Sequence, residues 1–118
     1  MRVFLWLLLL LTPLQAGAWD DSSPRIQEWF RNLKVPDDPT HLESCCGKGN
    51  AVEADDFEVD GDRYVAVVTD GHGLVPDGSR IVIPNSKRNV GSRNPTGHGI
   101  LFLDKDRRPI CYVSPTGG

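Results

Sequence analysis

The sequence predicts a small, mostly β protein: an antiparallel barrel or rolled sheet of about five strands with one N-terminal helix. Three observations lead to this fold class. An apolar stripe at helical spacing precedes the two adjacent cysteines, and a pattern of period two follows them, interrupted by Asp60-Gly61. A second pair of short apolar runs, separated by a charged turn, ends the chain.

The expected helix lies in "DDSSPRIQEWFRNLKVPDDP", residues 20–39. Ser22 or Ser23 is expected to cap it, and Pro24 suits the first helical turn. The prolines that follow end it. We expect its apolar face to pack on the protein's own sheet, with a docking surface for a partner as the alternative. That face consists of Ile26, Trp29, Phe30 and Leu33.

The first hairpin is expected in "DDFEVDGDRYVAVV", residues 55–68, with Asp60-Gly61 as a two-residue loop. The acidic residues of this segment lack the spacing of an EF-hand, so we expect a solvated strand face and no calcium site. With that loop, the expected cross-strand pairs are Phe57 with Tyr64 and Glu58 with Arg63.

Three further strands complete the expected sheet. "RIVIP" at 80–84 is one, and residues 100–103 and 110–113 form a second hairpin around "DKDRRP". Glycine and proline mark "TDGHGLVPDGSR", residues 69–80, as a loop. The long polar segment 85–99 has the length and composition of a functional or mobile loop.

Residues 1–18 have the pattern of a cleaved signal peptide. Arg2 precedes an apolar run over 3–11, and "AGA" at 16–18 offers the small side chains that a signal peptidase needs. We therefore predict that residues 19–118 form a single small domain in the periplasm or outside the cell. An uncleaved anchor is the alternative, but the run is about half of the roughly 20 residues that a bilayer requires. After cleavage we expect no stable membrane span.

Charge is unevenly distributed along the chain. Residues 20–62 carry twelve Asp and Glu against four Lys and Arg, a net charge of −8, whereas residues 63–118 carry four against eight, a net charge of +4. We expect the two halves to attract each other within one fold; two oppositely charged faces that dock a partner are the alternative. The acidic total argues against nucleic-acid binding, which requires a basic surface.

The three cysteines predict one long-range disulfide. In the chain-entropy model, a bridge from Cys111 to the vicinal pair would stabilise the fold by about 4 kcal/mol. We expect Cys46 to be the partner, because it adjoins the flexible Gly47, with Cys45 as the close alternative. A strained Cys45–Cys46 bond is a third arrangement.

The leftover thiol has three interpretations. It is buried and inert, as many unpaired cysteines are; it links two chains in a disulfide-bonded dimer; or it is reactive or metal-binding. A copper or zinc site can be drawn from Cys45, Cys46 and a histidine such as His41. The spacing matches no standard zinc motif, so we predict no metal ion and no cofactor.

The histidines and glycines of the two long loops are candidate ligand contacts. His72 and His98 each lie in a "GHG" triplet. The segment "SKRNVGSR" carries basic residues able to hold an anion such as a carboxylate or phosphate. No GxSxG, HExxH or P-loop signature occurs, so we assign no catalytic residues and expect a non-enzymatic protein. The candidate contacts are Cys45, His72, Arg93, Thr96 and His98.

Several motifs occurring in order, "SCCGKGN", "YVAVVTDG", "VPDGSRIVIPNSK" and "NPTGHGILFL…ICYVSP", resemble those of a family of small exported proteobacterial proteins. That family has a "CCG" loop and an "NPTGHG" segment before the last hairpin. The resemblance covers most of residues 19–118, and it implies export but no activity, substrate or catalytic residue. In the family an acidic, a small and an aspartate residue usually follow the "CCG" loop. Here Lys48, Gly49 and Asn50 stand there, which weakens a metal or general-acid role for this loop.

The sequence thus favours a disulfide-containing envelope domain of the binding or interaction class. Its ligand would be an envelope protein or a small anion, bound through the loops around Cys45, His72 and "SRNPTGHG". The first alternative is a periplasmic thiol or metal protein that uses Cys45, Cys46 and a histidine. The second is a small secreted enzyme with a site centred on His98.

Overall fold

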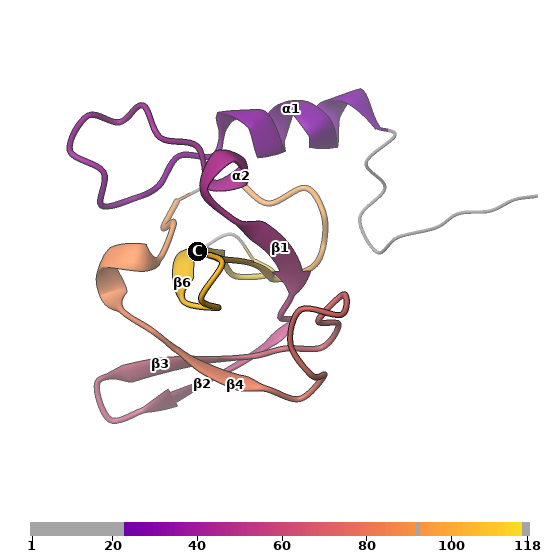
Figure 1. Ribbon diagram of the computed structural model, residues 1–118, viewed down its shortest axis with the longest axis vertical. Coiled ribbons are helices and arrows are strands. Elements are labelled where there is room, and N and C mark those ends of the chain that lie inside the picture. The colour runs from indigo at the N-terminus through magenta and orange to yellow at the C-terminus, as the bar shows by residue number, and fades with distance from the viewer. Residues whose placement is uncertain (1–22, 92, 117–118) are drawn as a thin grey trace, which may run out of the picture.

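The protein is built in three layers, as Figure 1 shows for the computed structural model, which describes residues 23–91 and 93–116. Helices α1 (Pro24–Asn32) and α2 (Cys45–Lys48) lie on one face of a sheet with the strand order β1-β5-β6. A second sheet, β2-β3-β4, packs on its other face, and both sheets are antiparallel. The strands are β1 (Asn50–Glu53), β2 (Asp56–Asp60), β3 (Arg63–Val67), β4 (Arg80–Ile83), β5 (Ile100–Leu103) and β6 (Pro109–Val113), and a 3-10 turn, η2 (Asn85–Lys87), follows β4.

Strand β5 is the centre of the core because both of its faces are buried. Leu101 and Leu103 point into the cluster between the two sheets, whereas Ile100 and Phe102 join the cluster beneath the helices. A strand covered on both sides has no face to expose to water, which explains the uninterrupted apolar run "ILFL". The second hairpin was predicted correctly, with a register irregularity between Phe102 and Leu103.

The mostly β, antiparallel character was predicted correctly, but the strand count and the closed form were not. The described residues form six strands rather than about five, in two sheets that do not close into a barrel. Isolated bridges join the sheets instead: Glu53 pairs with Asp70 at one place, and Arg88 pairs with Tyr112 at another. The strand missed from the sequence is β1, whose four residues "NAVE" are too short to show a period.

The first hairpin exists, but its loop lies one residue later than predicted, which shifts every cross-strand partner by two residues. Gly61 and Asp62 form the loop, so Asp60 pairs with Arg63, and Phe57 lies opposite Ala66. Gly61 has φ +65°, which suits the first loop position of a II′ hairpin turn, where glycine avoids the steric penalty of a side chain. Phe57 still stacks on Tyr64, now a diagonal neighbour, with ring centroids 5.0 Å apart. Glu58 pairs with Arg80 of β4 rather than with Arg63.

The predicted N-terminal helix is confirmed as α1, and it packs on the protein's own sheet. The Phe30 ring meets the Phe102 ring of β5 edge to face, with centroids 6.1 Å apart. Leu33, just beyond the helix, is buried. Ser23 stands at the N-cap, but its side chain makes no capping hydrogen bond. Ser22 and the predicted signal peptide, residues 1–18, lie outside the described residues.

The disulfide joins Cys45 to Cys111, so the preferred pairing with Cys46 is wrong and the alternative holds. Cys45 opens α2 and turns inward, where it and Cys111 are fully buried. The next residue of a helical turn points elsewhere, and Cys46 is exposed. The bridge therefore fastens the helical layer to β6 across 66 residues of sequence.

Ion pairs connect the acidic and basic halves of the chain, as their charges predicted. Lys87 Nζ lies 2.9 Å from Asp37 Oδ2, and Arg80 pairs with Glu58. Both pairs join residues from opposite sides of position 62. Because these pairs are partly exposed, each contributes little to the stability. Together they neutralise part of the opposite charge of the two halves within one molecule.

Candidate functional site

A buried glutamate lies where the two sheets meet. Glu53 is the last residue of β1, and its backbone N–H donates to the Asp70 carbonyl at 2.9 Å while its carbonyl accepts from the Thr69 N–H at 2.9 Å. The residue is 5% exposed, and its Oε2 makes no hydrogen bond. A buried acceptor without a donor is costly, so this carboxylate is a feature that needs an explanation.

The "NPTGHG" segment carries His98 to this carboxylate through the side chain of Asn94. Its amide nitrogen donates to the carbonyls of His98 (2.6 Å) and Ser114 (2.9 Å). Its amide oxygen accepts from the Thr96 N–H at 2.9 Å and from the Thr96 hydroxyl at 2.6 Å. Thr96 Oγ1 in turn accepts from the His98 N–H at 3.0 Å. The segment is therefore a compact turn that fixes the backbone of His98.

Asp55 holds the His98 ring in place. Nδ1 of His98 lies 3.2 Å from both oxygens of Asp55 and 3.5 Å from Glu53 Oε1. Asp55 also accepts from the Gly99 N–H at 2.9 Å. Gly99 has to be glycine because a Cβ there would lie 1.9 Å from the Ala54 carbonyl oxygen. This close approach brings the His98 loop against the end of β1.

His72 reaches the same glutamate from the loop after β3. Asp70 Oδ1 accepts from the His72 N–H at 3.0 Å, and Asp77 Oδ1 accepts from the Gly71 N–H at 2.9 Å. His72 has φ +50°, a left-handed conformation that few non-glycine residues adopt. Its Nε2 lies 3.9 Å from Glu53 Oε2 and 3.9 Å from Asp70 Oδ2.

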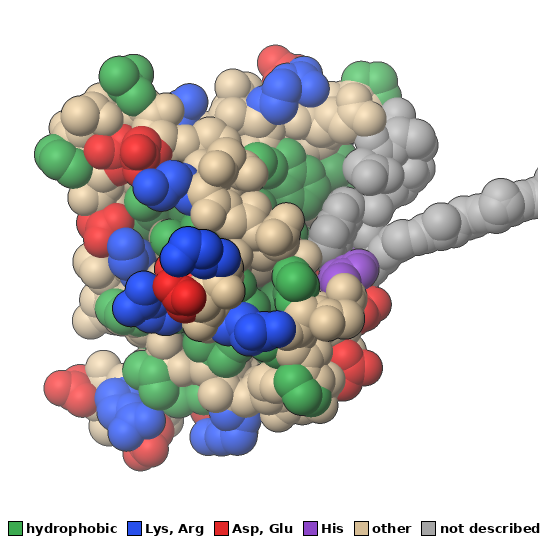
Figure 2. Space-filling view, in the orientation of Figure 1, with side chains coloured by type: hydrophobic (Ala, Val, Ile, Leu, Met, Phe, Trp, Pro, Cys, Tyr) green, Lys and Arg blue, Asp and Glu red, His purple; other side chains and the backbone are tan. Residues whose placement is uncertain are grey.

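We call this group the Glu53 cluster, and it consists of Glu53, Asp55, Asp70, His72 and His98. Two overlapping triplets have donor atoms within 4.8 Å of one another: Glu53, Asp70 and His72, and Glu53, Asp55 and His98. In Figure 2 a histidine side chain lies beside acidic ones at the right-hand edge of the molecule.

The electrostatics of the cluster centre on Glu53. Burial raises the pKa of Glu53; His98 opposes this effect, Asp55 and Asp70 add to it, and His72 also opposes it. A nearby cation would relieve the repulsion among the three carboxylates. The arrangement is therefore suited to binding positive charge.

The structure separates the predicted contact residues. His72 and His98 come together at Glu53, and Thr96 supports His98 through its backbone. Cys45 is fully buried in the disulfide, so it is not available as a contact. Arg93 lies apart, in a hollow of about 390 Å³ that it shares with Arg25, Trp29, Asn94 and Pro95.

The leftover thiol belongs to Cys46, which is exposed, so the buried interpretation is wrong. Its Sγ lies 3.6 Å from the Phe30 carbonyl oxygen, beside a hollow whose lining includes Phe30 and Arg31. Desolvation raises the pKa of this thiol, which lowers the fraction of reactive thiolate. A disulfide-linked dimer through Cys46 remains a prediction.

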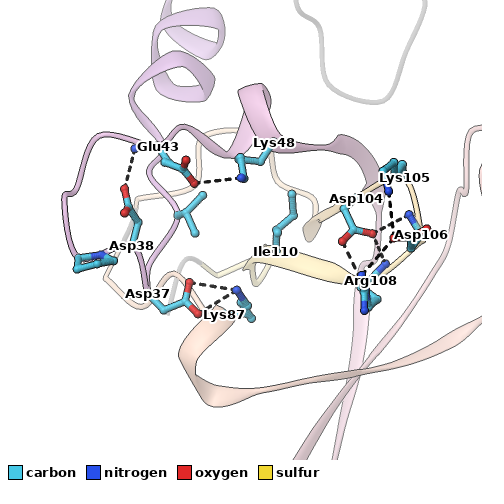
Figure 3. A pocket seen from close by; sticks show the side chains of 12 residues that line it. Asp37, Asp38, Glu43, Lys48, Lys87, Asp104, Lys105, Asp106, Arg108 and Ile110 are labelled. Atoms are coloured by element: carbon cyan, nitrogen blue, oxygen red, sulfur yellow. Dashed lines mark hydrogen bonds and ion pairs between the residues drawn. The ribbon is translucent and has the colours of Figure 1, made fainter.

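A larger hollow of about 610 Å³ lies between the 35–43 loop, Lys48, Lys87 and the 104–108 turn (Figure 3). Ion pairs line it: Lys48 Nζ is 3.3 Å from Glu43 Oε1, and Arg108 Nη2 is 3.1 Å from Asp106 Oδ2. Figure 2 shows blue side chains gathered in front of the C-terminal hairpin. Because opposite charges already meet along this hollow, it does not select a ligand of either sign.

Comparison with known protein families, characterised proteins and solved structures finds no match to this chain. Within the described part of the chain, no helix has both the length and the apolar character needed to cross a membrane. The geometry of the Glu53 cluster is therefore the feature of the molecule that bears on its function.

Sequence reasoning found the two histidines of the cluster but missed its carboxylates. Glu53 is in the missed strand β1, and Asp55 was assigned to a solvated strand face. Asp70 lies three residues after the end of β3, in the segment "TDGHG". An acidic residue two positions before a histidine in a glycine-bounded loop was the available signal, and it is weak by itself.

Proposed function

We propose that the protein is an exported, disulfide-containing binding domain that holds a cationic ligand at the Glu53 cluster. The observation that carries the proposal is the buried Glu53 carboxylate, whose Oε2 makes no hydrogen bond and faces a histidine 3.9 Å away. A bound cation would give this oxygen the partner that it lacks.

The balance of charge supports a cation rather than an anion. Three carboxylates share the cluster with two imidazoles, so a negative ligand would meet repulsion. Two of the basic residues predicted to bind a small anion already have other partners. Lys87 pairs with Asp37, and Arg88 lies over the Tyr64 ring at 4.1 Å from its centroid. Among the described residues, the hollow lined by Arg25 and Arg93 still favours an anion as a second ligand.

The disulfide supports export, because such bonds persist in oxidising compartments and are rare in the cytosol. A location in the periplasm or outside the cell therefore belongs to the proposal. The resemblance to exported proteobacterial proteins points the same way.

The alternative functions fit the geometry less well. A thiol or metal site using Cys45, Cys46 and a histidine loses a ligand, because Cys45 is oxidised in the disulfide. An enzyme centred on His98 retains an orienting carboxylate in Asp55. Among the residues that the structure describes, however, no hydroxyl or thiol hydrogen-bonds to the His98 ring to serve as a nucleophile.

Native mass spectrometry of the untagged protein, isolated from the envelope of the cell that makes it, tests the proposal. We expect a mass in excess of the denatured chain, and we expect Glu53→Gln to remove that excess. Glu58→Gln, on the exposed β2 hairpin, is the matched control and should retain it. A folded protein with no bound mass would refute the proposal.

A further inference from the structure

We infer that the ligand of the Glu53 cluster is a single divalent first-row transition-metal ion, bound by Glu53, Asp70 and His72. This inference rests on the proposed function, and it replaces the sequence prediction of no metal ion. The three donors are Glu53 Oε2, Asp70 Oδ2 and His72 Nε2.

The spacing of the donors fits an ion lying between them. His72 Nε2 lies 3.9 Å from Glu53 Oε2 and 3.9 Å from Asp70 Oδ2, which is too long for a hydrogen bond. Two ligands about 2.1 Å from a tetrahedral zinc ion are roughly 3.4 Å apart, and wider bond angles extend this to about 3.9 Å. All three donor groups lie within 4.8 Å of one another, so rotation of the partly exposed Asp70 and His72 side chains would let them coordinate one ion.

The donor types select a transition metal over other cations. Ca²⁺ and Mg²⁺ take oxygen ligands, whereas an imidazole nitrogen with carboxylates suits Zn²⁺ and its neighbours. An ammonium group would need acceptors about 2.8 Å from its nitrogen, and acceptors in a tetrahedral arrangement around it would lie roughly 4.6 Å apart. The observed 3.9 Å separations are closer to those of a metal site.

His98 and Asp55 provide the support that metal ligands require. Nδ1 of His98 faces Glu53 Oε1 at 3.5 Å and the Asp55 carboxylate at 3.2 Å. These contacts from Asp55 through His98 hold Oε1 of Glu53, and they leave Oε2 facing His72. Partners of this kind typically change metal affinity by about 10- to 100-fold when they are removed.

The site is open on one side and connects the two sheets. The side chains of Asp70 and His72 are 51% and 35% exposed, whereas that of Glu53 is 7% exposed. An ion can therefore enter from solvent and retain a water ligand, as three-ligand zinc sites do. Because β1 supplies Glu53 and the loop after β3 supplies the others, the ion would also link the sheets.

Calorimetric titration of the EDTA-treated, untagged full chain with ZnCl₂ tests the inference. We expect one Zn²⁺ per chain and no heat from CaCl₂ at the same concentration. His72→Ala should weaken the binding at least tenfold, and it removes a partly exposed side chain, so the fold should survive. His41→Ala, on an exposed loop outside the cluster, is the matched control and should leave the affinity unchanged.

The outcomes separate this inference from the proposed function. Loss of zinc binding in His72→Ala, but not in His41→Ala, supports both. A Glu53-dependent bound mass that survives EDTA, with no zinc binding, would retain a cation-binding domain and overturn the metal assignment. Zinc binding that His72→Ala leaves unchanged would place the metal elsewhere and overturn the assignment too. Absence of both zinc binding and bound mass would overturn both claims.

Discussion

Replacing Asn94 tests the link between the "NPTGHG" segment and the position of His98. Asn94 makes four hydrogen bonds, two as a donor to carbonyls and two as an acceptor from Thr96. At about 1 kcal/mol net for each bond, and with some compensation by water because the site is only partly buried, Asn94→Ala should cost about 3 kcal/mol of unfolding free energy. That is a large fraction of the stability of a domain of this size.

Asn94→Asp sharpens the test because it keeps the size of the side chain. The new carboxylate can still accept from Thr96, but it cannot donate to the carbonyls of His98 and Ser114, and its charge repels them. We expect it to be at least as destabilising as Asn94→Ala. Urea unfolding measures both variants, and Asn89→Ala is the control, since Asn89 Nδ2 donates one hydrogen bond, to the Lys34 carbonyl.

A second readout connects stability to the site. In Asn94→Ala the NMR signals of the His98 ring should broaden or shift toward those of an exposed histidine, because its backbone is no longer fixed. Unfolding free energies of both Asn94 variants within about 0.5 kcal/mol of wild type would refute the assigned hydrogen-bond network, since that is the range of ordinary surface substitutions.

Three further predictions concern the disulfide, the thiol and the acidic loop. Reducing Cys45–Cys111 should lower the unfolding free energy by about 4 kcal/mol, which lowers the urea midpoint by roughly 2 to 4 M. The control, Cys46→Ser, should leave the midpoint unchanged. An unchanged midpoint after reduction would contradict the role of the bridge. Alkylation of Cys46 should reach half its maximal rate at a higher pH than that of an unstructured cysteine peptide, since desolvation raises the pKa of its thiol; a lower value would indicate a reactive thiolate. Asp38 accepts from the Glu43 N–H, the Thr40 hydroxyl and N–H, and the Leu42 N–H, which lower its pKa from 3.8 to about 2. Because the folded pKa is depressed, its contribution to stability is present above pH 3.8 and is lost as the pH falls through about 2; an NMR titration midpoint near 3.8 would contradict this.

Much of the fold could be read from the sequence because its signals are local. Three elements are predicted by residues within the element itself. The apolar spacing indicates α1, the glycine turn indicates the hairpin around Gly61, and the continuous apolar run "ILFL" indicates β5. Gly61, rather than Asp60, sets the register, since only glycine meets no steric penalty at the left-handed loop position.

The site could not be read in the same way because it depends on long-range pairing. Glu53 is in a strand of four residues whose identity depends on pairing with β5, almost fifty positions later. The bridge between Glu53 and Asp70 then brings His72 to the carboxylate, and no local pattern encodes that bridge. The choice of Cys45 over Cys46 likewise depends on which residue of α2 turns inward.

Anomalous scattering at the zinc edge, from crystals of the full chain grown with Zn²⁺, tests the central claim most directly. We predict one strong peak about 2.0 to 2.2 Å from Glu53 Oε2, Asp70 Oδ2 and His72 Nε2. A peak at Cys46 or His41 with none at Glu53, or no peak in a folded protein, would contradict the account.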